Sequence, residues 1–271
     1  MASRRSDWRI IGRITHNKKH LAILLDALFE LGGKMIKAIV FDLDDTLYPQ
    51  EVPFTKAIKK VFPQLIKEEL TDFFKLFRTI SDELYEQTKQ KNGITKSEMT
   101  TLRLTKAIEE SFDLQVTEPL IASFESEYNR QLNQIRLSDS LKEVLHKLAK
   151  KYKLGIVTNG YTQRQELKIE VLKVRDIISP ENILISEKIG IEKPDRRIFD
   201  QMAKVLVCEP RELLYIGDNY KNDIVGAKRA GWHAWWFNHH QRRIPEEIIE
   251  IPDKEIRYFG KLAEELSLLV E

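Results

Sequence analysis

The feature that most constrains the fold of this chain is the alternation of short apolar runs with helical patterns. A short apolar run bounded by Gly, Asp or Asn is typical of a buried strand. Such runs occupy residues 37–41, 153–157, 182–186, 213–216 and 234–238, and 255–259 is a weaker candidate for a last strand. Apolar residues recur at helical spacing over 138–151, 162–175, 194–206 and 221–230, and a closing helix is expected over 261–270. This alternation predicts an α/β fold: a Rossmann-like doubly wound parallel sheet with helices on both faces.

Residues 49–136 interrupt the alternation, because they contain no convincing strand pattern. Helical patterns are expected over 54–68, 70–90, 97–111 and 118–134, with breaks at Asn92-Gly93 and Glu118-Pro119. Large apolar residues give this segment a core of its own: Phe54, Ile58, Val61, Phe62, Leu65, Phe73, Phe74, Leu76, Phe77 and Ile80. We predict a four-helix insertion, 49–136, in a core domain formed by 35–48 and 137–271.

Residues 1–34 precede the first strand pattern and are basic at their start. Leucines at helical spacing predict an amphipathic helix over 18–31. The extension could be a transit peptide, an ordinary appended helix, or a stretch upstream of a true start at Met35. We favour the last interpretation, because the first strand begins directly after Met35 and the codons of Gly32-Gly33-Lys34 could form a bacterial ribosome-binding site. A native mass matching the full chain would exclude it.

The charge balance narrows the class of partner. Lys+Arg number 44 and Asp+Glu 42, so the formal net charge of +2 does not indicate nucleic acid or a membrane surface. The one cysteine, Cys208, excludes a disulfide framework and a cysteine-based zinc site, and fits a reducing cytosol. No apolar run approaches the roughly 20 residues of a membrane span. We expect a cytoplasmic monomer or homodimer whose partner is a small molecule.

An acidic cluster follows the first strand pattern. Asp42 and Asp44 are two positions apart, so their side chains point the same way in extended chain. Adjacent carboxylates repel each other and cost desolvation free energy, which a hard cation such as Mg²⁺ can offset. A solvated turn in which Asp44 or Asp45 caps a helix would give the same pattern, so this motif alone does not decide.

Three further polar motifs lie at or near other strand ends. They are Thr158-Asn159-Gly160, Lys193, and Gly217-Asp218 with Asp223. The first offers a hydroxyl, an amide and a backbone N–H suited to phosphate oxygens. Each motif alone is compatible with an ordinary turn, a surface lysine or a helix cap. Parallel strands gather their carboxyl ends at one edge of the sheet, so we expect all four motifs to meet there.

Together these motifs resemble those of the haloacid dehalogenase (HAD) superfamily. The stretch 42–46 matches its first motif, DxDxT, Thr158 its second, Lys193 its third, and Gly217-Asp218 with Asp223 its fourth. The helical insertion resembles a C1-type cap. The resemblance runs from about Ile36 to the C-terminus and is specific for the superfamily and its fold rather than for a substrate.

The resemblance implies roles for these positions. Asp42 would be the nucleophile that forms an aspartyl-phosphate. Asp44 would protonate the leaving alcohol and then take a proton from water. Lys193 would neutralise Asp42 and the phosphoryl group in the transition state.

The resemblance also implies ligands for metal and phosphate. Asp42, the Asp44 backbone carbonyl and Asp218 would hold Mg²⁺, with Asp223 supporting the metal. Thr158, Asn159 and Gly160 would bind phosphate oxygens. The cap would close over the substrate on hinges near Tyr48-Pro49 and Ile135-Ser138.

The motifs separate some reactions and leave others open. A dehalogenase of this kind needs neither a metal nor an acid two residues after the nucleophile, so Asp44 and Asp218 favour a Mg²⁺-dependent phosphomonoester hydrolase. Within the superfamily, the chain is most similar to the nucleotidase-like branch, on the basis of the motif-two sequence, residues 187–194 and residues 236–238. Nucleoside 5'-monophosphates are therefore the first substrates to test. Sugar-acid phosphatases belong to the same branch, and a phosphomutase shares the motifs. A non-catalytic phosphate-binding protein would be expected to have lost one of the key aspartates.

Several other residues have two interpretations. Tyr48, Phe54 and Tyr128 could stack on a base, although ordinary core packing is the simpler interpretation. His239-His240 beside Arg242-Arg243 could bind metal or phosphate, but we favour a solvated loop. Trp232, Trp235 and Trp236 are expected around the last core strand, and Cys208 is expected to be a small buried residue.

Overall fold

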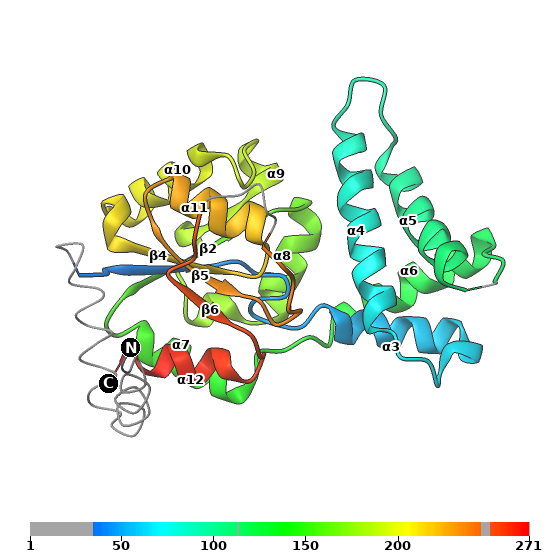
Figure 1. Ribbon diagram of the computed structural model, residues 1–271, viewed down its shortest axis with the longest axis horizontal. Helices are drawn as coiled ribbons and strands as arrows, with labels where there is room; N and C mark the ends of the chain where they lie inside the picture. Colours follow the sequence, from blue (N-terminus) through cyan, green and yellow to red (C-terminus); the bar gives the residue numbers. More distant parts are fainter. Residues whose placement is uncertain (1–34, 113, 245–249, 271) are drawn as a thin grey trace, which may run out of the picture. The chain divides into compact units, whose positions relative to one another are not determined.

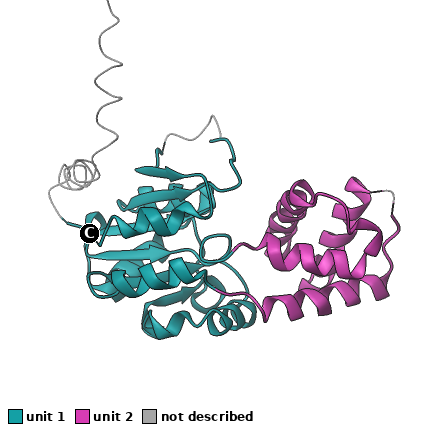
Figure 2. Cartoon of the chain, turned by 90° about the horizontal axis from the view of Figure 1, so that it is seen from below, with its two compact units in different colours: residues 1–48, 137–271 teal, residues 49–136 magenta. Residues whose placement is uncertain are grey.

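The computed structural model describes residues 35–112, 114–244 and 250–270, and it divides into two compact units (Figure 2). Of the described residues, those up to Tyr48 and those from Leu137 onward form the first unit, and those in Pro49–Arg136 form the second. The expectations for residues 1–34 lie outside the described part of the chain. Among the described residues, no helix is long and apolar enough to cross a membrane.

A parallel sheet forms the centre of the first unit. Its described strands are β1 (Ala38–Phe41), β2 (Lys153–Thr158), β3 (Ile183–Ile185), β4 (Leu213–Gly217), β5 (His233–Phe237) and β6 (Lys254–Ile256). They lie in the order β3-β2-β1-β4-β5-β6, and every neighbouring pair is parallel. Every residue of the central strands β1 and β4 is buried, which accounts for their unbroken apolar sequences. The predicted Rossmann-like, doubly wound α/β fold is confirmed.

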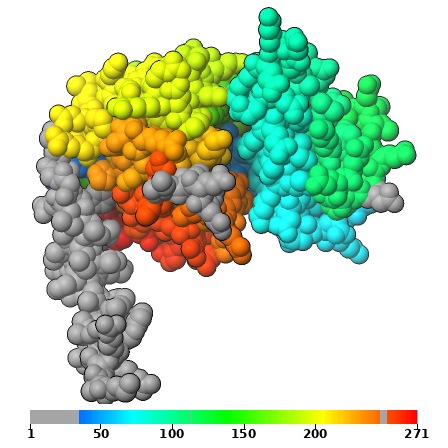
Figure 3. All heavy atoms as spheres, turned by 45° about the horizontal axis from the view of Figure 1, so that its top comes forward, coloured from blue at the N-terminus to red at the C-terminus, as the bar shows by residue number. Residues whose placement is uncertain are grey.

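Helices cover both faces of this sheet (Figure 1). α10 (Arg196–Leu206) and α11 (Gly226–Arg229) lie on one face, and α7 (Asp139–Leu148) and α12 (Lys261–Ser267) lie on the other. The start of α10 is capped by the Asp195 side chain, which accepts a hydrogen bond from the Arg197 N–H at 2.9 Å. In the space-filling view, the C-terminal part of the chain, coloured orange to red, gathers on one face of the unit (Figure 3).

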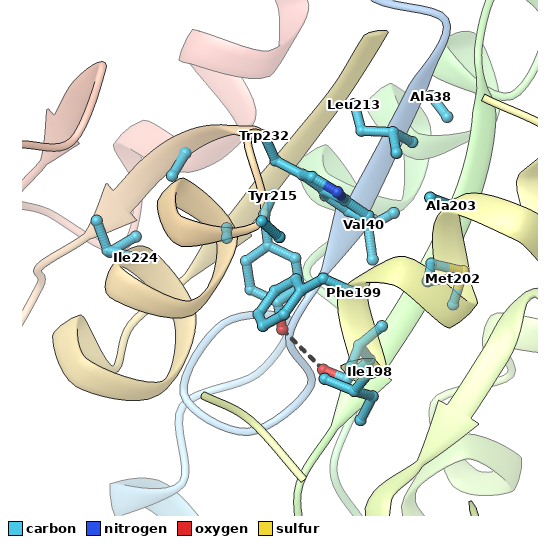
Figure 4. Packing of buried hydrophobic residues seen from close by; sticks show 14 of the residues in the cluster. Ala38, Val40, Ile198, Phe199, Met202, Ala203, Leu213, Tyr215, Ile224 and Trp232 are labelled. Carbon is cyan, nitrogen blue, oxygen red and sulfur yellow. Dashed lines mark hydrogen bonds between the residues drawn. The ribbon is translucent and has the colours of Figure 1, made fainter. Parts of the chain in front are cut away.

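An aromatic cluster joins α10 to the sheet (Figure 4). The Phe199 ring meets the rings of Tyr215 and Trp232 edge-on, with centroids 5.4 and 5.6 Å apart. Trp232 and its neighbours Trp235 and Trp236 are all buried, as expected. Cys208, in contrast, is only half-buried, because it lies in the loop that follows α10.

The second unit is a helical insertion of the C1-cap type, as predicted. Its described part contains four α-helices: α3 (Glu51–Val61), α4 (Thr71–Thr88), α5 (Lys96–Ser111) and α6 (Glu118–Leu132). Phe54 of α3 is fully buried at the centre of this unit, where its ring lies 4.6 Å from that of Phe77 and 5.8 Å from that of Phe124. Thr95 and Glu98 form a reciprocal capping box at the start of α5.

Some element boundaries differ from those that periodicity predicts. The helix expected over 54–68 is α3, which ends at Val61 because Pro63 begins a separate 3-10 turn. The helix expected over 221–230 is a π-helical segment, η5 (Tyr220–Val225), that continues into α11. The one-turn helix α9 (Ser186–Ile189), which directly follows β3, was not predicted.

Candidate active site at the strand ends

The turn after β1 is shaped by its backbone. The Asp42 N–H donates to the Ile216 carbonyl of β4 at 2.9 Å, which fixes Asp42 at the end of β1 beside β4. Asp45 adopts the left-handed conformation with φ 57°, which aspartate tolerates better than most residues. The Leu47 N–H then returns to the Leu43 carbonyl at 3.0 Å and closes the turn.

A buried lysine lies at the centre of the site. Lys193 Nζ is 2.6 Å from Asp42 Oδ1 and 2.7 Å from Asp223 Oδ1, and its side chain is 3% exposed. It also donates to the Tyr215 hydroxyl at 2.9 Å, and that hydroxyl donates to the Val157 carbonyl of β2 at 2.8 Å. A buried cation is stable only when it is paired, and here each of its contacts comes from a different place in the sequence.

Three of the expected acidic residues converge beside this lysine. Carboxylate oxygens of Asp42, Asp218 and Asp223 lie within 4.8 Å of one another. Burial raises the pKa of Asp42 to about 7, with Lys193 opposing the rise and Asp223 adding to it. Burial also raises the pKa of Asp218 well above its usual range, and the nearby Asp45 carboxylate adds to this effect.

This donor set fits a hard divalent cation. All of the donor atoms are carboxylate oxygens, the ligands that a hard cation such as Mg²⁺ prefers. Asp42 and Asp218 have raised pKa values, and a bound cation would favour their ionised forms. Gly217 leaves room for the set, because a Cβ at that position would lie 2.3 Å from Asp223 Oδ2. Asp42, Asp218 and Asp223 are therefore able to hold the ion.

Gly217 allows a direct test of this arrangement. Gly217→Ala is expected to raise the Mg²⁺ concentration needed for half-maximal activity by about 10- to 100-fold, because the new methyl group must displace the Asp223 carboxylate. Gly260→Ala is the matched control, since a Cβ at Gly260 meets nothing within 4 Å. An unchanged Mg²⁺ titration in a folded Gly217→Ala protein would contradict the assignment of Asp223 to the metal site.

The turn after β2 does more than the sequence indicated. The Asn159 side chain donates to the Lys193 carbonyl at 2.8 Å and accepts from the Lys193 N–H at 2.9 Å, so its amide holds the lysine backbone. The Gly160 N–H donates to Ser186 Oγ at 3.0 Å. The Thr158 hydroxyl lies at the strand end and accepts from Gln165 Nε2 at 2.5 Å. Thr158 ends β2 and the other two predicted residues follow it, and both the Asn159 side-chain amide and the Gly160 N–H already have partners within the protein.

The Asp44 carboxylate is not part of the Asp42–Asp218–Asp223 cluster and has contacts that the motifs did not predict. Lys168 Nζ is 2.7 Å from each of its carboxylate oxygens. The Tyr48 hydroxyl donates to Asp44 Oδ1 at 2.5 Å, and Gln165 Nε2 donates to Oδ2 at 3.1 Å. Gln165 and Lys168 come from α8 (Thr162–Val171), where their spacing of three places them on one face. In the sequence, the only sign of this role was that two polar residues share one face of the predicted helix.

The interpretation of 239–243 as a solvated loop was wrong for the histidines. The side chains of His239 and His240 are only 10% and 6% exposed, and their Nε2 atoms lie 2.9 Å from the Asp45 carbonyl and 3.4 Å from Asp45 Oδ2. Burial lowers the pKa of His239 to about 4, so the ring is neutral near pH 7. Arg242 Nη1 lies 3.6 Å from Asp218 Oδ2. Since β5 ends beside β4, the start of this loop lies against Asp45, whereas residues 241–244 are exposed.

The proposed base-stacking aromatics serve other purposes. Phe54 and Tyr128 belong to the core of the helical unit, with centroids 6.3 Å apart and exposed fractions of 0% and 6%. Tyr48 is buried in the first unit, where its hydroxyl contacts Asp44. The favoured core-packing interpretation therefore holds for Phe54 and Tyr128, and the burial of all three rings leaves the alternative of base stacking without support.

Comparison with known proteins agrees with this geometry. Residues 39–237 match the haloacid dehalogenase-like hydrolase family. A glyceraldehyde 3-phosphate phosphatase from Methanopyrus kandleri is 29% identical over 82% of this chain and 93% of its own length. The pyrimidine 5'-nucleotidase YjjG from Escherichia coli is 36% identical over 35% of this chain and 42% of its own length.

A solved structure shows the same fold. The HAD-hydrolase YfnB from Bacillus subtilis, solved bound to magnesium, superimposes with a TM-score of 0.64 at 24% identity, covering 86% of this chain and 99% of that protein. The family match covers the four motifs at the strand ends as well as the helical insertion. The chain belongs to the haloacid dehalogenase-like hydrolase family.

Proposed function

We propose that this protein is a Mg²⁺-dependent phosphomonoester hydrolase that acts through an aspartyl-phosphate on Asp42. The observation that carries the proposal is the buried Asp42–Lys193–Asp223 ion-pair cluster with Asp218 at the carboxyl ends of β1 and β4. Phosphoryl transfer needs a positioned nucleophile and charge neutralisation, and these residues can provide both.

In the first step, an Asp42 carboxylate oxygen attacks phosphorus while the bond from phosphorus to the ester oxygen breaks. Asp44 gives its proton to that oxygen, and the alcohol leaves. In the second step, Asp44 takes a proton from water as the water oxygen attacks phosphorus, which releases inorganic phosphate and restores Asp42. Mg²⁺, held by Asp42, the Asp44 carbonyl and Asp218, would supply positive charge to the phosphoryl oxygens.

The remaining residues of the site would hold and neutralise the phosphoryl group. The Lys193 ammonium, 2.6 Å from Asp42 Oδ1, would offset the negative charge that gathers as the nucleophile and the phosphoryl group approach each other. The Thr158 hydroxyl and the Asn159 N–H would bind phosphoryl oxygens. The Asn159 side chain would act indirectly, because it holds the Lys193 backbone.

The relatives supply two substrate classes to test. The glyceraldehyde 3-phosphate phosphatase of Methanopyrus kandleri aligns over 93% of its length, whereas the nucleotidase YjjG aligns over 42%. We therefore rank short-chain sugar and aldehyde phosphates above pyrimidine 5'-monophosphates as substrates. This order reverses the first choice made from the motifs alone.

A panel of phosphate monoesters tests the proposed activity. Glyceraldehyde 3-phosphate, phosphoglycolate, uridine 5'-monophosphate and p-nitrophenyl phosphate should be compared at equal Mg²⁺, with phosphate release as the readout. A Mg²⁺-dependent preference for one class supports the proposal and identifies its substrate. Phosphate moved within a sugar phosphate without release would indicate a phosphomutase. No turnover by a folded protein that binds Mg²⁺ would indicate a binding protein instead.

Removal of the divalent cation is expected to reduce turnover to the background rate. Without it, Asp42 and Asp218 have raised pKa values and no cation to favour their ionised forms. Activity should be measured after EDTA treatment and again after excess Mg²⁺ is added back, with circular dichroism as the control for folding. Mg²⁺ should also raise the melting temperature, because it binds the folded state. Full activity in EDTA would contradict a metal-dependent mechanism.

A further inference from the structure

Helix α8 carries two buried polar side chains that lie outside the four motifs. Gln165 and Lys168 are 1% and 4% exposed. Lys168 Nζ donates to Gln165 Oε1 at 2.7 Å, so the two side chains form a connected pair. A lysine buried to this extent must be paired, because an isolated buried ammonium is strongly disfavoured.

The charge partner of this lysine is Asp44. Its ammonium contacts both carboxylate oxygens, at 2.7 Å each, and the Asp44 side chain is 20% exposed against 5% for Lys168. Contact with both oxygens fixes the rotation of the carboxyl group as well as its position. Asp44 and Lys168 are 124 residues apart in the chain, so only the fold brings them together.

Gln165 extends the pair to the turn after β2. Its Nε2 atom donates to Asp44 Oδ2 at 3.1 Å and to Thr158 Oγ1 at 2.5 Å. One helix face therefore contacts the side chains of two proposed site residues, one after β1 and one at the end of β2. This arrangement couples the position of the proton-transfer group to that of a phosphate-binding hydroxyl.

We propose that Lys168 is a positioning residue that holds the Asp44 carboxyl group by one oxygen while the other oxygen carries the proton that passes to the leaving oxygen, with Gln165 linking it to Thr158. The inference rests on the proposed function, in which Asp44 transfers the proton. Lys168 itself contacts neither phosphorus nor the leaving group in this role. Its effect on the reaction passes through Asp44.

A positioning role of this kind predicts a dependence on the leaving group. An alkoxide needs the proton from Asp44 as its bond to phosphorus breaks, whereas p-nitrophenolate is stable enough to leave without it. Loss of the Lys168 ammonium should therefore slow alkyl esters much more than the aryl ester. A merely structural defect would slow both to the same extent.

The experiment compares Lys168→Met with wild type on glyceraldehyde 3-phosphate, uridine 5'-monophosphate and p-nitrophenyl phosphate, all with saturating Mg²⁺. We expect kcat to fall about 100-fold on the alkyl ester that wild type turns over, but less than about 5-fold on p-nitrophenyl phosphate. Lys168→Gln, which keeps a polar donor without the charge, is measured in parallel in case the methionine variant does not fold. Lys188→Met is the matched control, because the Lys188 side chain is 64% exposed and lies 3.6 Å from Glu166.

A double variant separates action through Asp44 from an independent effect. Asp44→Asn should show the same leaving-group dependence, and adding Lys168→Met to it should cost little more, because both changes remove one function. An equal loss on aryl and alkyl esters, or fully additive losses in the double variant, would overturn the positioning role while leaving phosphatase activity in place. A folded wild-type protein that hydrolyses none of the esters would overturn the proposed function, and this inference with it.

Discussion

Asp42→Asn is expected to lower kcat by at least about 10⁴-fold, because an amide cannot replace the carboxylate that attacks phosphorus. The fold should survive the change. Asparagine has nearly the same shape as aspartate, and Lys193 retains its 2.7 Å contact with Asp223. The change also removes the negative charge of Asp42, and with it the repulsion between this carboxylate and that of Asp223.

The measurement is kcat on p-nitrophenyl phosphate with saturating Mg²⁺, together with a thermal melt. Asp72→Asn is the matched control, because the Asp72 side chain is 95% exposed and lies in the helical unit. Intact mass should verify that the asparagine has not reverted to aspartate by deamidation. Activity near that of wild type in a verified Asp42→Asn protein would overturn the nucleophile assignment.

Lys193→Met is expected to lower kcat by about 10²- to 10³-fold and to destabilise the folded protein. The ammonium is the buried counter-charge of Asp42 and Asp223, and burial of carboxylates without it is costly. Loss of one partner of a buried ion pair typically costs about 3–5 kcal/mol. Mg²⁺ should restore part of the lost stability, because it can neutralise the same carboxylates.

Two measurements separate these effects. Urea unfolding with and without Mg²⁺ gives the change in stability, and kcat at a temperature where the variant is folded gives the change in catalysis. Lys188→Met, which removes an exposed lysine, should change neither. A fully active Lys193→Met protein would show that charge neutralisation by this residue is not needed for the reaction.

The sequence predicted the fold and most of the converging residues, because both depend on local patterns. Strand runs such as 37–41 and 213–216 stand out because their strands are buried on both faces, and parallel topology then places Asp42 and Asp218 at one edge. The helical insertion was visible because its apolar periodicity does not depend on the rest of the chain. Helix ends were predicted less accurately, because apolar periodicity does not show where a helix stops. α3 ends before Pro63, and the helix expected over 221–230 begins as the π-helical segment η5.

The contacts that periodicity could not predict are those between distant polar residues. The contact between Lys168 and Asp44 joins two separate elements, and so does the contact between Lys193 and Tyr215. No local sequence pattern identifies which residue will be the partner in such a contact. His239 and His240 were assigned to solvent because polar residues in a loop usually lie there. Because β5 lies two strands from β1 in the sheet, the loop after β5 instead brings both histidines into contact with Asp45. Long-range polar contacts of this kind require the three-dimensional fold.

Trapping the phosphoryl group on the enzyme tests the central claim most directly. Wild-type protein is mixed with the best ester of the panel and Mg²⁺, quenched in acid within one turnover, and reduced with borohydride, which converts an aspartyl-phosphate to homoserine. Peptide mass spectrometry then locates the modified residue. The account predicts homoserine at position 42 in wild type and none in Asp42→Asn. Modification of a different residue, or turnover with no modified residue under conditions that trap a known aspartyl-phosphate enzyme, would contradict it.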